Sequence, residues 1–220
     1  MKNLIEPHGS DTLKPLYIGN SANINSILAA SKKMPKLLLN SAAAANAVML
    51  GAGYFTPLNG YMDKKNALSV AENMCTKDGL FWPVPIINLS KKVDGLNVGN
   101  EIALLDPNVD GNPILATQHI TAIDKLTDEE IKFIANKIFG TTDAEHPGVA
   151  NFMDLGNYLI SGTIKVLNYS YFPTEFPGTF ATAPEIREML LSAGWNKTVA
   201  FQTRNPMHRA HEELCKMALD

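Results

Sequence analysis

Six polar side chains stand close together near the C-terminal end of the chain, in a pattern that could hold an oxyanion. They are Gln202, Thr203, Arg204, Asn205, His208 and His211, within the segment VAFQTRNPMHRAH. A guanidinium can bind two oxygens of a tetrahedral oxyanion at once. Imidazoles can stabilise the negative charge that grows on phosphoryl oxygens in a transition state. These residue types therefore indicate a site for a phosphate or another tetrahedral oxyanion.

A strand is predicted to present the first of these residues. The segment KTVAFQTR, residues 197–204, is short and apolar, which is typical of a buried strand. Side chains two residues apart on a strand point the same way, so Gln202 and Arg204 would share a face at its C-terminal end. Open α/β sheets bind ligands just outside the carboxyl ends of their strands.

A helix is predicted to present the two histidines. Asn205 is a strong N-cap, and Pro206 fits the first helical position because its missing N–H would be unpaired there. The first turn of such a helix offers free N–H groups and a partial positive charge to an anion. His208 and His211, three residues apart, would lie on one face of this helix.

Each part of the pattern also has a simpler explanation. Two histidines three apart on a helix are more often partly exposed side chains than a site. They are also a weak zinc pair, because helical zinc pairs favour a spacing of four and no third ligand is evident. Arg204 could form a structural ion pair, and Asn205 could simply start a helix. The string as a whole is more specific than its parts.

The front 170 residues predict a domain of another kind. Helices are predicted at 42–50 with Ser41 as the cap, at 64–74, and at 128–139 with Thr127 as the cap. Strands are predicted at 83–90, 99–106, 114–126 and 157–167. Several strands at short spacing, with few crossover helices, favour a small antiparallel barrel or sandwich with helices attached.

A connecting segment separates this domain from the polar motif. Residues 168–183 are rich in aromatic residues, Pro and Thr, and we expect a linker that packs against another part of the protein rather than swinging freely. A helix follows at 184–193, with Thr182 as the cap and Gly194 as the stop. Helix, strand, turn and helix are the opening of a doubly wound α/β domain. No second parallel strand follows in the sequence, so we expect a truncated domain.

Composition excludes several classes of protein. The chain has 220 residues, of which 45% are hydrophobic, and a net charge of −3, whereas nucleic-acid binders usually carry a basic domain or stripe. The N-terminal residues lack the apolar region of a signal peptide, and the longest apolar stretch is too short to span a bilayer. Cys75 and Cys215 are expected to be reduced, half-buried thiols of a cytoplasmic protein.

The sequence resembles the ATP sulfurylase (sulfate adenylyltransferase) family. FQTRNPMHRAHEEL is similar to its signature, with Gln-x-Arg-Asn-Pro-x-His-x-x-His complete. IEPHGSDTL and GYFTPLNGYM resemble two further family segments, the second with Thr56 and Tyr61 as mild departures. DGLFWPVPI, GTTDAEHPGV and the Pro-x-Glu-x-Arg run that starts at Pro184 also fit, so the resemblance covers the whole chain.

The resemblance implies a fold and a reaction. The expected fold is an α+β N-terminal domain with a PUA-like β-barrel at residues 1–170. The first helix-strand-helix of a truncated α/β catalytic domain, Rossmann-like and of the HIGH nucleotidyltransferase type, would follow at residues 171–220. The implied reaction transfers AMP from MgATP to sulfate and gives adenosine 5′-phosphosulfate and pyrophosphate, reversibly. No covalent enzyme intermediate is expected, so catalysis would consist of positioning and charge neutralisation.

The resemblance also assigns roles to the motif residues. Gln202 and Arg204 would hold sulfate, and Thr203, Arg204 and Asn205 match the residues that the family treats as catalytic, joined by His208 and His211. The ATP-binding residues would be Gln202, Asn205, His208 and His211. Mg²⁺ would enter with ATP, and no protein-bound metal is expected. The implied partners are ATP, sulfate, pyrophosphate and adenosine 5′-phosphosulfate, without nucleic acid or membrane, in a cytoplasmic protein that is a homo-oligomer when full length.

Two other functions stay open from the sequence. One is a nucleotidyltransferase with a larger acceptor, such as a mononucleotide. The other is a PUA-like RNA-binding module, which the negative net charge and the lack of a Lys/Arg stripe oppose. The family's second catalytic motif, a Gly-Arg-Asp-His stretch, is absent, so we expect this chain alone to be inactive. The direction of the reaction in the cell, and any kinase domain fused to the protein, are not fixed by these residues.

Overall fold

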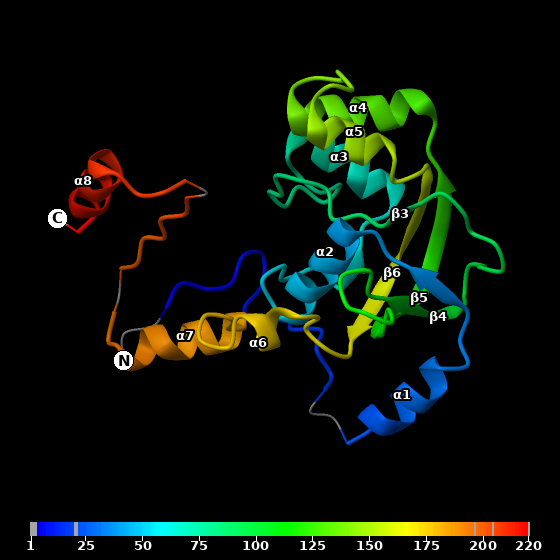
Figure 1. Ribbon diagram of the computed structural model, residues 1–220, viewed down its shortest axis with the longest axis horizontal. Coiled ribbons are helices and arrows are strands. Elements are labelled where there is room, and N and C mark those ends of the chain that lie inside the picture. The colour runs from blue at the N-terminus through cyan, green and yellow to red at the C-terminus, as the bar shows by residue number, and fades with distance from the viewer. Residues whose placement is uncertain (1–3, 20–21, 196, 204, 220) are drawn as a thin grey trace. The chain divides into compact units, whose positions relative to one another are not determined.

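The computed structural model describes residues 4–19, 22–195, 197–203 and 205–219 (Figure 1). The chain divides into two compact units. The larger is Glu6–Pro184, and the smaller combines Met1–Ile5 with Glu185–Asp220. The two units are therefore described separately.

The larger unit contains a mixed sheet with helices attached to it. Its elements are α1 (Ile24–Ser31), β1 (Lys36–Leu38), α2 (Ser41–Gly51), β2 (Gly60–Tyr61), α3 (Lys64–Asn73), β3 (Leu89–Ser90), β4 (Glu101–Leu105), β5 (Ile114–Lys125), α4 (Asp128–Phe139), α5 (Pro147–Met153), β6 (Tyr158–Val166) and α6 (Phe172–Glu175). The mixture of α and β elements agrees with the predicted α+β class.

The sheet is open along the path that its strand pairs define. The strand order is β1-β4-β5-β6-β2, and β3 also pairs with β6. Among the named strands of the described residues, β1 and β4 are parallel and the other pairs are antiparallel. Among the described residues no ladder joins β1 to β2, the two ends of the path, so the predicted closed barrel is not confirmed.

Three of the four strands predicted in the front 170 residues are confirmed, and the fourth is largely wrong. The patterns at 99–106, 114–126 and 157–167 correspond to β4, β5 and β6. In the segment 83–90, only Leu89 and Ser90 form a strand. Pro83 and Pro85 have no N–H to donate to a ladder. The segment still accepts single hydrogen bonds, from Met62 N to Ile86 O at 2.9 Å and from Ile160 N to Asn88 O at 3.0 Å.

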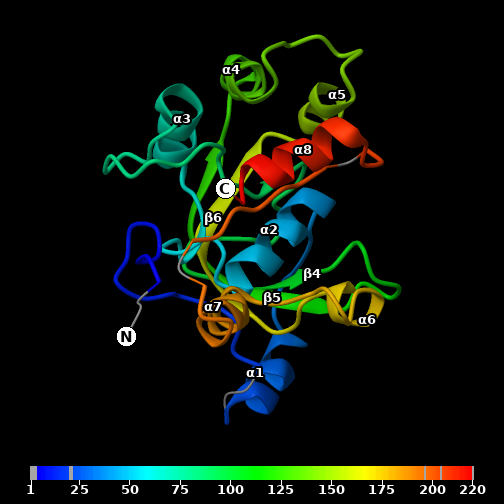
Figure 2. The same ribbon diagram turned by 90° about the vertical axis from the view of Figure 1, so that its left-hand side faces the viewer.

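Helix α2 covers one face of the long strands β5 and β6, as Figure 2 shows. Its buried side chains include Ala43, Ala44 and Ala47, which let the helix approach the sheet closely. The hydroxyl of Tyr61 donates a hydrogen bond to Ala43 O at 2.7 Å, and burial raises the pKa of this hydroxyl. The core of the unit therefore lies between α2 and the centre of the sheet.

The cap of α2 differs from the sequence prediction. The N-cap is Asn40 rather than Ser41, because the Asn40 side chain accepts from Ala43 N at 2.8 Å and donates to Leu89 O at 3.1 Å. Ser41 is the first helical residue, and its hydroxyl donates to Asn108 Oδ1. An amide can accept and donate at once, so Asn40 both starts the helix and ties it to β3.

Two glycines allow β2, β6 and β5 to approach each other. A Cβ on Gly60 would overlap the carbonyl oxygen of Gly162, and a Cβ on Gly162 would overlap the carbonyl oxygen of His119. Gly162 also has a φ of 149°, which side chains rarely permit. The register of β5 and β6 shifts nearby, between Ile120 and Ala122. The close contact of these strands therefore depends on the absence of side chains.

Helices α3, α4 and α5 gather at one end of the sheet (Figure 1). Helix α4 starts with the predicted cap: Thr127 Oγ1 accepts from Glu130 N at 3.2 Å, and Glu130 Oε2 accepts from Thr127 N at 2.9 Å. Glu130 also pairs with Lys64 at 2.7 Å, at the start of α3. The hydrogen bond from Lys64 and then that from Thr127 N hold the pKa of Glu130 below its ordinary value.

We expect Thr127→Ala to lower the free energy of unfolding by about 1–2 kcal/mol, because the substitution removes the N-cap of α4. The matched control is Thr141→Ala, which removes a hydroxyl that accepts one N–H in a loop, from Asp143 at 3.0 Å. Urea unfolding followed by circular dichroism would measure both variants. Equal losses in the two variants would show that the capping box is no more stabilising than an ordinary loop hydrogen bond.

The connecting segment 168–183 packs against the core, as predicted. Tyr169, Phe172 and Phe180 lie against the buried cluster. The rings of Tyr169 and Phe180 are 5.3 Å apart, and those of Phe172 and Phe180 are 6.0 Å apart. Ala183 N donates to Ala52 O at 2.9 Å. Its aromatic side chains thus fasten this segment to the larger unit.

Helix α7 (Ala183–Ser192) begins at the end of the larger unit, and its residues from Glu185 onward belong to the smaller unit. The smaller unit also contains α8 (Arg209–Met217). Helix α7 confirms the predicted helix at 184–193, and Gly194 follows it with a φ of 69°. Its apolar side chains are largely exposed, and Trp195 has an exposed fraction of 60%. Among the described helices of the chain, none combines the length and the hydrophobicity that crossing a membrane requires.

The predicted strand at 197–204 is not formed. Residues 197–203 are exposed and irregular, and Arg204 lies outside the described residues. A strand exists through hydrogen bonds to a neighbouring strand. No described residue forms a ladder with this segment, so its apolar character alone does not make it a strand.

Helix α8 begins at Arg209 rather than at Pro206, the predicted first residue. Its N-cap is His208, not Asn205. The hydroxyl oxygen of Thr203 accepts from Asn205 N at 3.0 Å, which makes a local turn before the helix. The cap forms at His208 because its N–H donates to His211 Nδ1 at 3.3 Å.

Candidate active site

The motif residues predicted to do chemistry lie at and before the start of α8. Gln202, Thr203 and Asn205 are exposed, in the irregular segment that precedes the helix. His208 is the exposed N-cap, and His211 is half-buried in the first turn. Arg204, the residue assigned the most roles by the sequence, lies outside the described residues. The functions of all six therefore stay predictions.

The structure brings the two histidines together. Their ring centroids are 3.9 Å apart with an interplanar angle of 37°, and the ring of Phe201 is 5.5 Å from that of His211. Since His211 Nδ1 accepts the N–H of His208, the neutral His211 ring carries its proton on Nε2. That Nε2–H is a donor that an oxyanion could accept. The pair thus adds side-chain donors to the N-terminus of α8.

Thr203 and Asn205 form a second, separate pair. The Thr203 hydroxyl accepts from Asn205 N at 3.0 Å and lies 3.1 Å from Asn205 O, to which it can donate. In the described part of the motif, no hydrogen bond or ring contact joins this pair to the two histidines. The structure therefore assembles the predicted site in two pieces rather than as one cluster.

His8 and His146, which lie in the family-like segments IEPHGSDTL and GTTDAEHPGV, make contacts within the larger unit. His8 Nε2 lies 2.7 Å from Phe81 O, and its ring is 5.9 Å from that of Trp82. His146 is the N-cap of α5, where its Nδ1 accepts from Gly148 N and Val149 N at 3.2 and 3.3 Å. These contacts give both side chains a role in turns of the larger unit.

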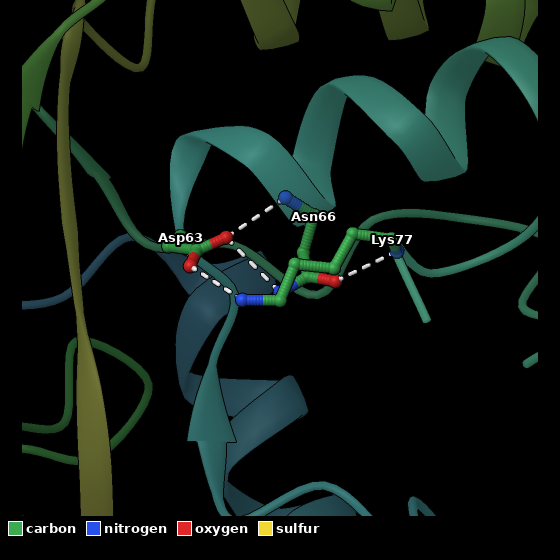
Figure 3. Close-up of polar contacts among 3 residues, drawn as sticks. All are labelled: Asp63, Asn66 and Lys77. Atoms are coloured by element: carbon green, nitrogen blue, oxygen red, sulfur yellow. Dashed lines mark hydrogen bonds and ion pairs between the residues drawn. The ribbon is translucent and has the colours of Figure 1, made fainter. Parts of the chain in front are cut away.

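Sequence reasoning missed a polar hollow in the larger unit. Its volume is about 370 Å³, and polar residues from the start of α3, the loop after it and β6 line it. Asp63 Oδ1 accepts from both Asn66 N at 2.8 Å and Asn66 Nδ2 at 3.0 Å, as Figure 3 shows. Asn66 Oδ1 accepts from Lys77 N at 3.1 Å, and Lys77 Nζ lies 3.8 Å from Asp63 Oδ2.

This network ties the loop after α3 to the start of that helix. The sequence signal for it is the pair Asp63 and Asn66, at the N-cap and third positions of α3. The hollow itself has no sequence signal, because its walls come from segments far apart in the chain. Cys75 in the larger unit and Cys215 in the smaller unit are both free and half-buried, as expected.

No metal centre of the usual kind is found in the described parts of the chain. They contain no group of three or more His, Cys, Asp or Glu side chains close enough to hold an ion. The two histidines of the motif thus have no third side chain of these types beside them.

Two family models match this chain, and the first of them matches most of its length. Residues 5–169 match the family model of the PUA-like domain, which covers most of the chain. The chain therefore belongs to the PUA-like domain family. Residues 178–220 match a second model, described as ATP-sulfurylase.

Curated relatives then identify the kind of protein to which this chain is similar. The sulfate adenylyltransferase of Alcanivorax borkumensis is 54% identical over 98% of this chain and 54% of its own length. That of Allochromatium vinosum is 48% identical over 99% of this chain and 55% of its own length. That of the Riftia pachyptila sulfur-oxidizing endosymbiont is 43% identical, over 99% of this chain and 49% of its own length. The resemblance to this family is confirmed, and the chain spans about half the length of these relatives.

A solved structure has a similar fold. It is a hexameric APS kinase from Thiobacillus denitrificans, with a TM-score of 0.75 and 25% sequence identity. The match covers 99% of this chain and 38% of that chain. A longer protein thus contains a region that resembles nearly all of the chain described above.

Proposed function

We propose that the protein carrying this chain is a sulfate adenylyltransferase. It transfers AMP from MgATP to sulfate and produces adenosine 5′-phosphosulfate and pyrophosphate, in a reversible reaction. The observation that carries the proposal is the 54% identity to a curated sulfate adenylyltransferase over 98% of this chain. The complete motif from Gln202 to His211 lies within the matched residues and supplies the expected side chains for an oxyanion site.

The proposed domain organisation follows the sequence prediction. In this proposal residues 1–170 form a PUA-like domain with a β-barrel, and residues 171–220 begin a Rossmann-like catalytic domain of the HIGH type. Exposed apolar side chains in the smaller unit support this proposal. Val199, Phe201 and Leu214 have exposed fractions of 64%, 42% and 54%, and large apolar patches are normally covered by other parts of a protein. A neighbouring parallel strand would give residues 197–203 the strand partner that they lack among the described residues.

The proposed chemistry is an in-line displacement at the α-phosphorus of ATP. A sulfate oxygen forms a bond to the α-phosphorus while the bond to the bridging oxygen of pyrophosphate breaks, and pyrophosphate leaves with that electron pair. Both reactants are anions, so their approach needs positive charge and hydrogen-bond donors. Arg204 and Gln202 would bind sulfate, and Mg²⁺ would arrive with ATP as part of the substrate.

The remaining motif residues act on the nucleotide in this proposal. His208 and His211 donate to ATP phosphate oxygens, and Thr203 and Asn205 complete the catalytic set, with Gln202 and Asn205 also contacting ATP. The contact between His208 N and His211 Nδ1 supports the donor role of His211, because it leaves the Nε2–H free. No proton transfer is needed in the displacement, so these side chains act by position and charge.

We further propose that the full-length protein is a cytoplasmic homo-oligomer that acts on ATP, sulfate, pyrophosphate and adenosine 5′-phosphosulfate without a nucleic-acid or membrane partner. The similar solved structure is that of a hexameric protein, which supports an oligomeric form. The net charge of −3 supports the absence of a nucleic-acid partner.

The test is the acceptor dependence of pyrophosphate release by the full-length protein that carries this sequence. With MgATP alone we expect almost no release, and addition of sulfate should start it. A mononucleotide added in place of sulfate should have no effect, because the proposed site is built for a small tetrahedral anion. Release that needs the mononucleotide rather than sulfate would replace this function with that of another nucleotidyltransferase.

A further inference from the structure

The loop that joins β4 to β5 has the residue spacing of a calcium-binding loop. Its sequence is DPNVDGNP, residues 106–113. Asp106, Asn108 and Asp110 stand at the first, third and fifth positions, and Gly111 stands at the sixth. This matches the first half of the pattern D-x-[DN]-x-[DN]-G, in which side-chain oxygens at alternate positions converge on one cation.

The backbone of the loop has the bend that this pattern requires. Gly111 has a φ of 78°, which favours glycine, and Asn112 follows with a φ of 46°. Asp106 N donates to Pro113 O at 2.9 Å, and Asn112 N donates to Val109 O at 3.0 Å. The two ends of the loop are therefore held together, and the loop curves back on itself between them.

The buried carboxylate of Asp106 supports a cation site independently of the loop's sequence and backbone. Its side chain is fully buried, with an exposed fraction of 0%. Oδ1 accepts from Asn108 N at 2.9 Å, so this oxygen faces the loop. Oδ2 is also buried and receives no hydrogen bond from the described residues. Burying a carboxylate oxygen without a hydrogen-bond partner raises the free energy of the folded state. A bound cation would explain why this oxygen has no partner in the protein.

The other candidate ligands are oxygens as well. The hydroxyl of Ser41 donates to Asn108 Oδ1, which holds the Asn108 side chain beside the start of α2. Asp110, at the fifth position, is exposed. The carbonyl oxygen of Asn112 stands at the seventh position, where the pattern uses a backbone ligand. Two carboxylates, one amide oxygen and one carbonyl oxygen suit a hard divalent cation.

We propose that the loop 106–112 binds a divalent cation, Ca²⁺ in preference to Mg²⁺. Ca²⁺ accepts irregular sets of six to eight oxygens, whereas Mg²⁺ demands a small and nearly ideal octahedron. The twelfth position of the pattern is Thr117, buried in β5, instead of a bidentate Glu. The affinity is therefore weak, with a dissociation constant of about 10⁻⁴–10⁻³ M. The site is separate from the substrate Mg²⁺ of the proposed reaction.

The test is calorimetric titration of the full-length protein with CaCl₂, without nucleotide and at constant ionic strength. Wild type should bind with the weak affinity given above, and MgCl₂ should bind at least tenfold more weakly. Asp110→Asn should weaken Ca²⁺ binding at least tenfold. Because Asp110 is exposed, this variant should fold normally, which its thermal transition in EDTA will check.

The matched control is Asp94→Asn. Asp94 is also an exposed aspartate directly before a glycine with positive φ, Gly95, but Ser90 and Lys92 precede it at the alternate positions. This variant should bind Ca²⁺ like wild type. The proposal is overturned if wild type shows no Ca²⁺ binding, or if Asp110→Asn and Asp106→Asn both bind as tightly as wild type.

Discussion

Replacement of Arg204 by alanine should lower the rate of sulfate-dependent pyrophosphate release by about a hundred- to a thousand-fold. In the proposed reaction, its guanidinium holds sulfate and neutralises charge beside the α-phosphorus. Loss of one such donor from an oxyanion site typically lowers kcat by about 10²–10³. The measurement is the rate of release by the full-length protein across a range of sulfate and MgATP concentrations.

Lys216→Ala is the control for the loss of a positive charge. Lys216 lies on α8 and pairs with Glu212 at 2.8 Å and Glu213 at 3.0 Å, so its charge is already compensated. This variant should keep nearly the wild-type rate. Full activity of Arg204→Ala would remove Arg204 from the proposed site, even if the reaction itself were established.

The second large effect is expected at Gly162. Gly162→Ala should lower the free energy of unfolding by roughly 4 kcal/mol or more, which only a few mechanisms produce. The new Cβ would overlap the carbonyl oxygen of His119 on β5, and neither backbone can move without breaking the longest ladder of the sheet. The φ of 149° adds backbone strain. Denaturant unfolding would measure the loss.

Gly99→Ala separates these two causes. Gly99 also has a positive φ, of 87°, but no atom lies within 4 Å of the position of its Cβ. Strain alone should cost about 1–2 kcal/mol there. A loss at Gly162 no larger than that at Gly99 would mean that the strands separate easily and that their close approach is not needed.

The sequence predicts local structure well where the determinants are local. The capping box at Thr127 and Glu130 is complete within four residues, and α4 begins where that pattern predicts. The segment at 114–126 becomes β5, in which buried and exposed side chains alternate from Gln118 to Thr121. In both cases neighbouring residues carry the whole signal.

Prediction fails where distant segments decide the structure. The segment 83–90 is apolar enough for a strand, but its prolines and its few contacts with Met62 and Ile160 leave only Leu89 and Ser90 in a ladder. Whether the sheet closes depends on which strands become neighbours, which no local pattern states. The cap of α2 depends on Leu89, far from Asn40 in sequence.

The candidate site shows the same division. The residue types from Gln202 to His211 are evident in the sequence, and so is the expected class of ligand. The strand and the helix start predicted for them were wrong, because residues 197–203 find no neighbouring strand among the described residues and His208 caps α8. The class of ligand could be inferred from the residue types and their spacing. The spatial arrangement of these residues depends on pairing with other strands, which the local sequence does not specify.

An open sheet also has two edges at which another molecule could add a strand and begin aggregation. Here the edge strands β1 and β2 are only three and two residues long. Lys36 begins β1 with a charged side chain, and Met62 N, just after β2, is already bonded to Ile86 O. Short and partly occupied edges give an incoming strand few hydrogen bonds to form. This sheet therefore limits intermolecular pairing without closing on itself.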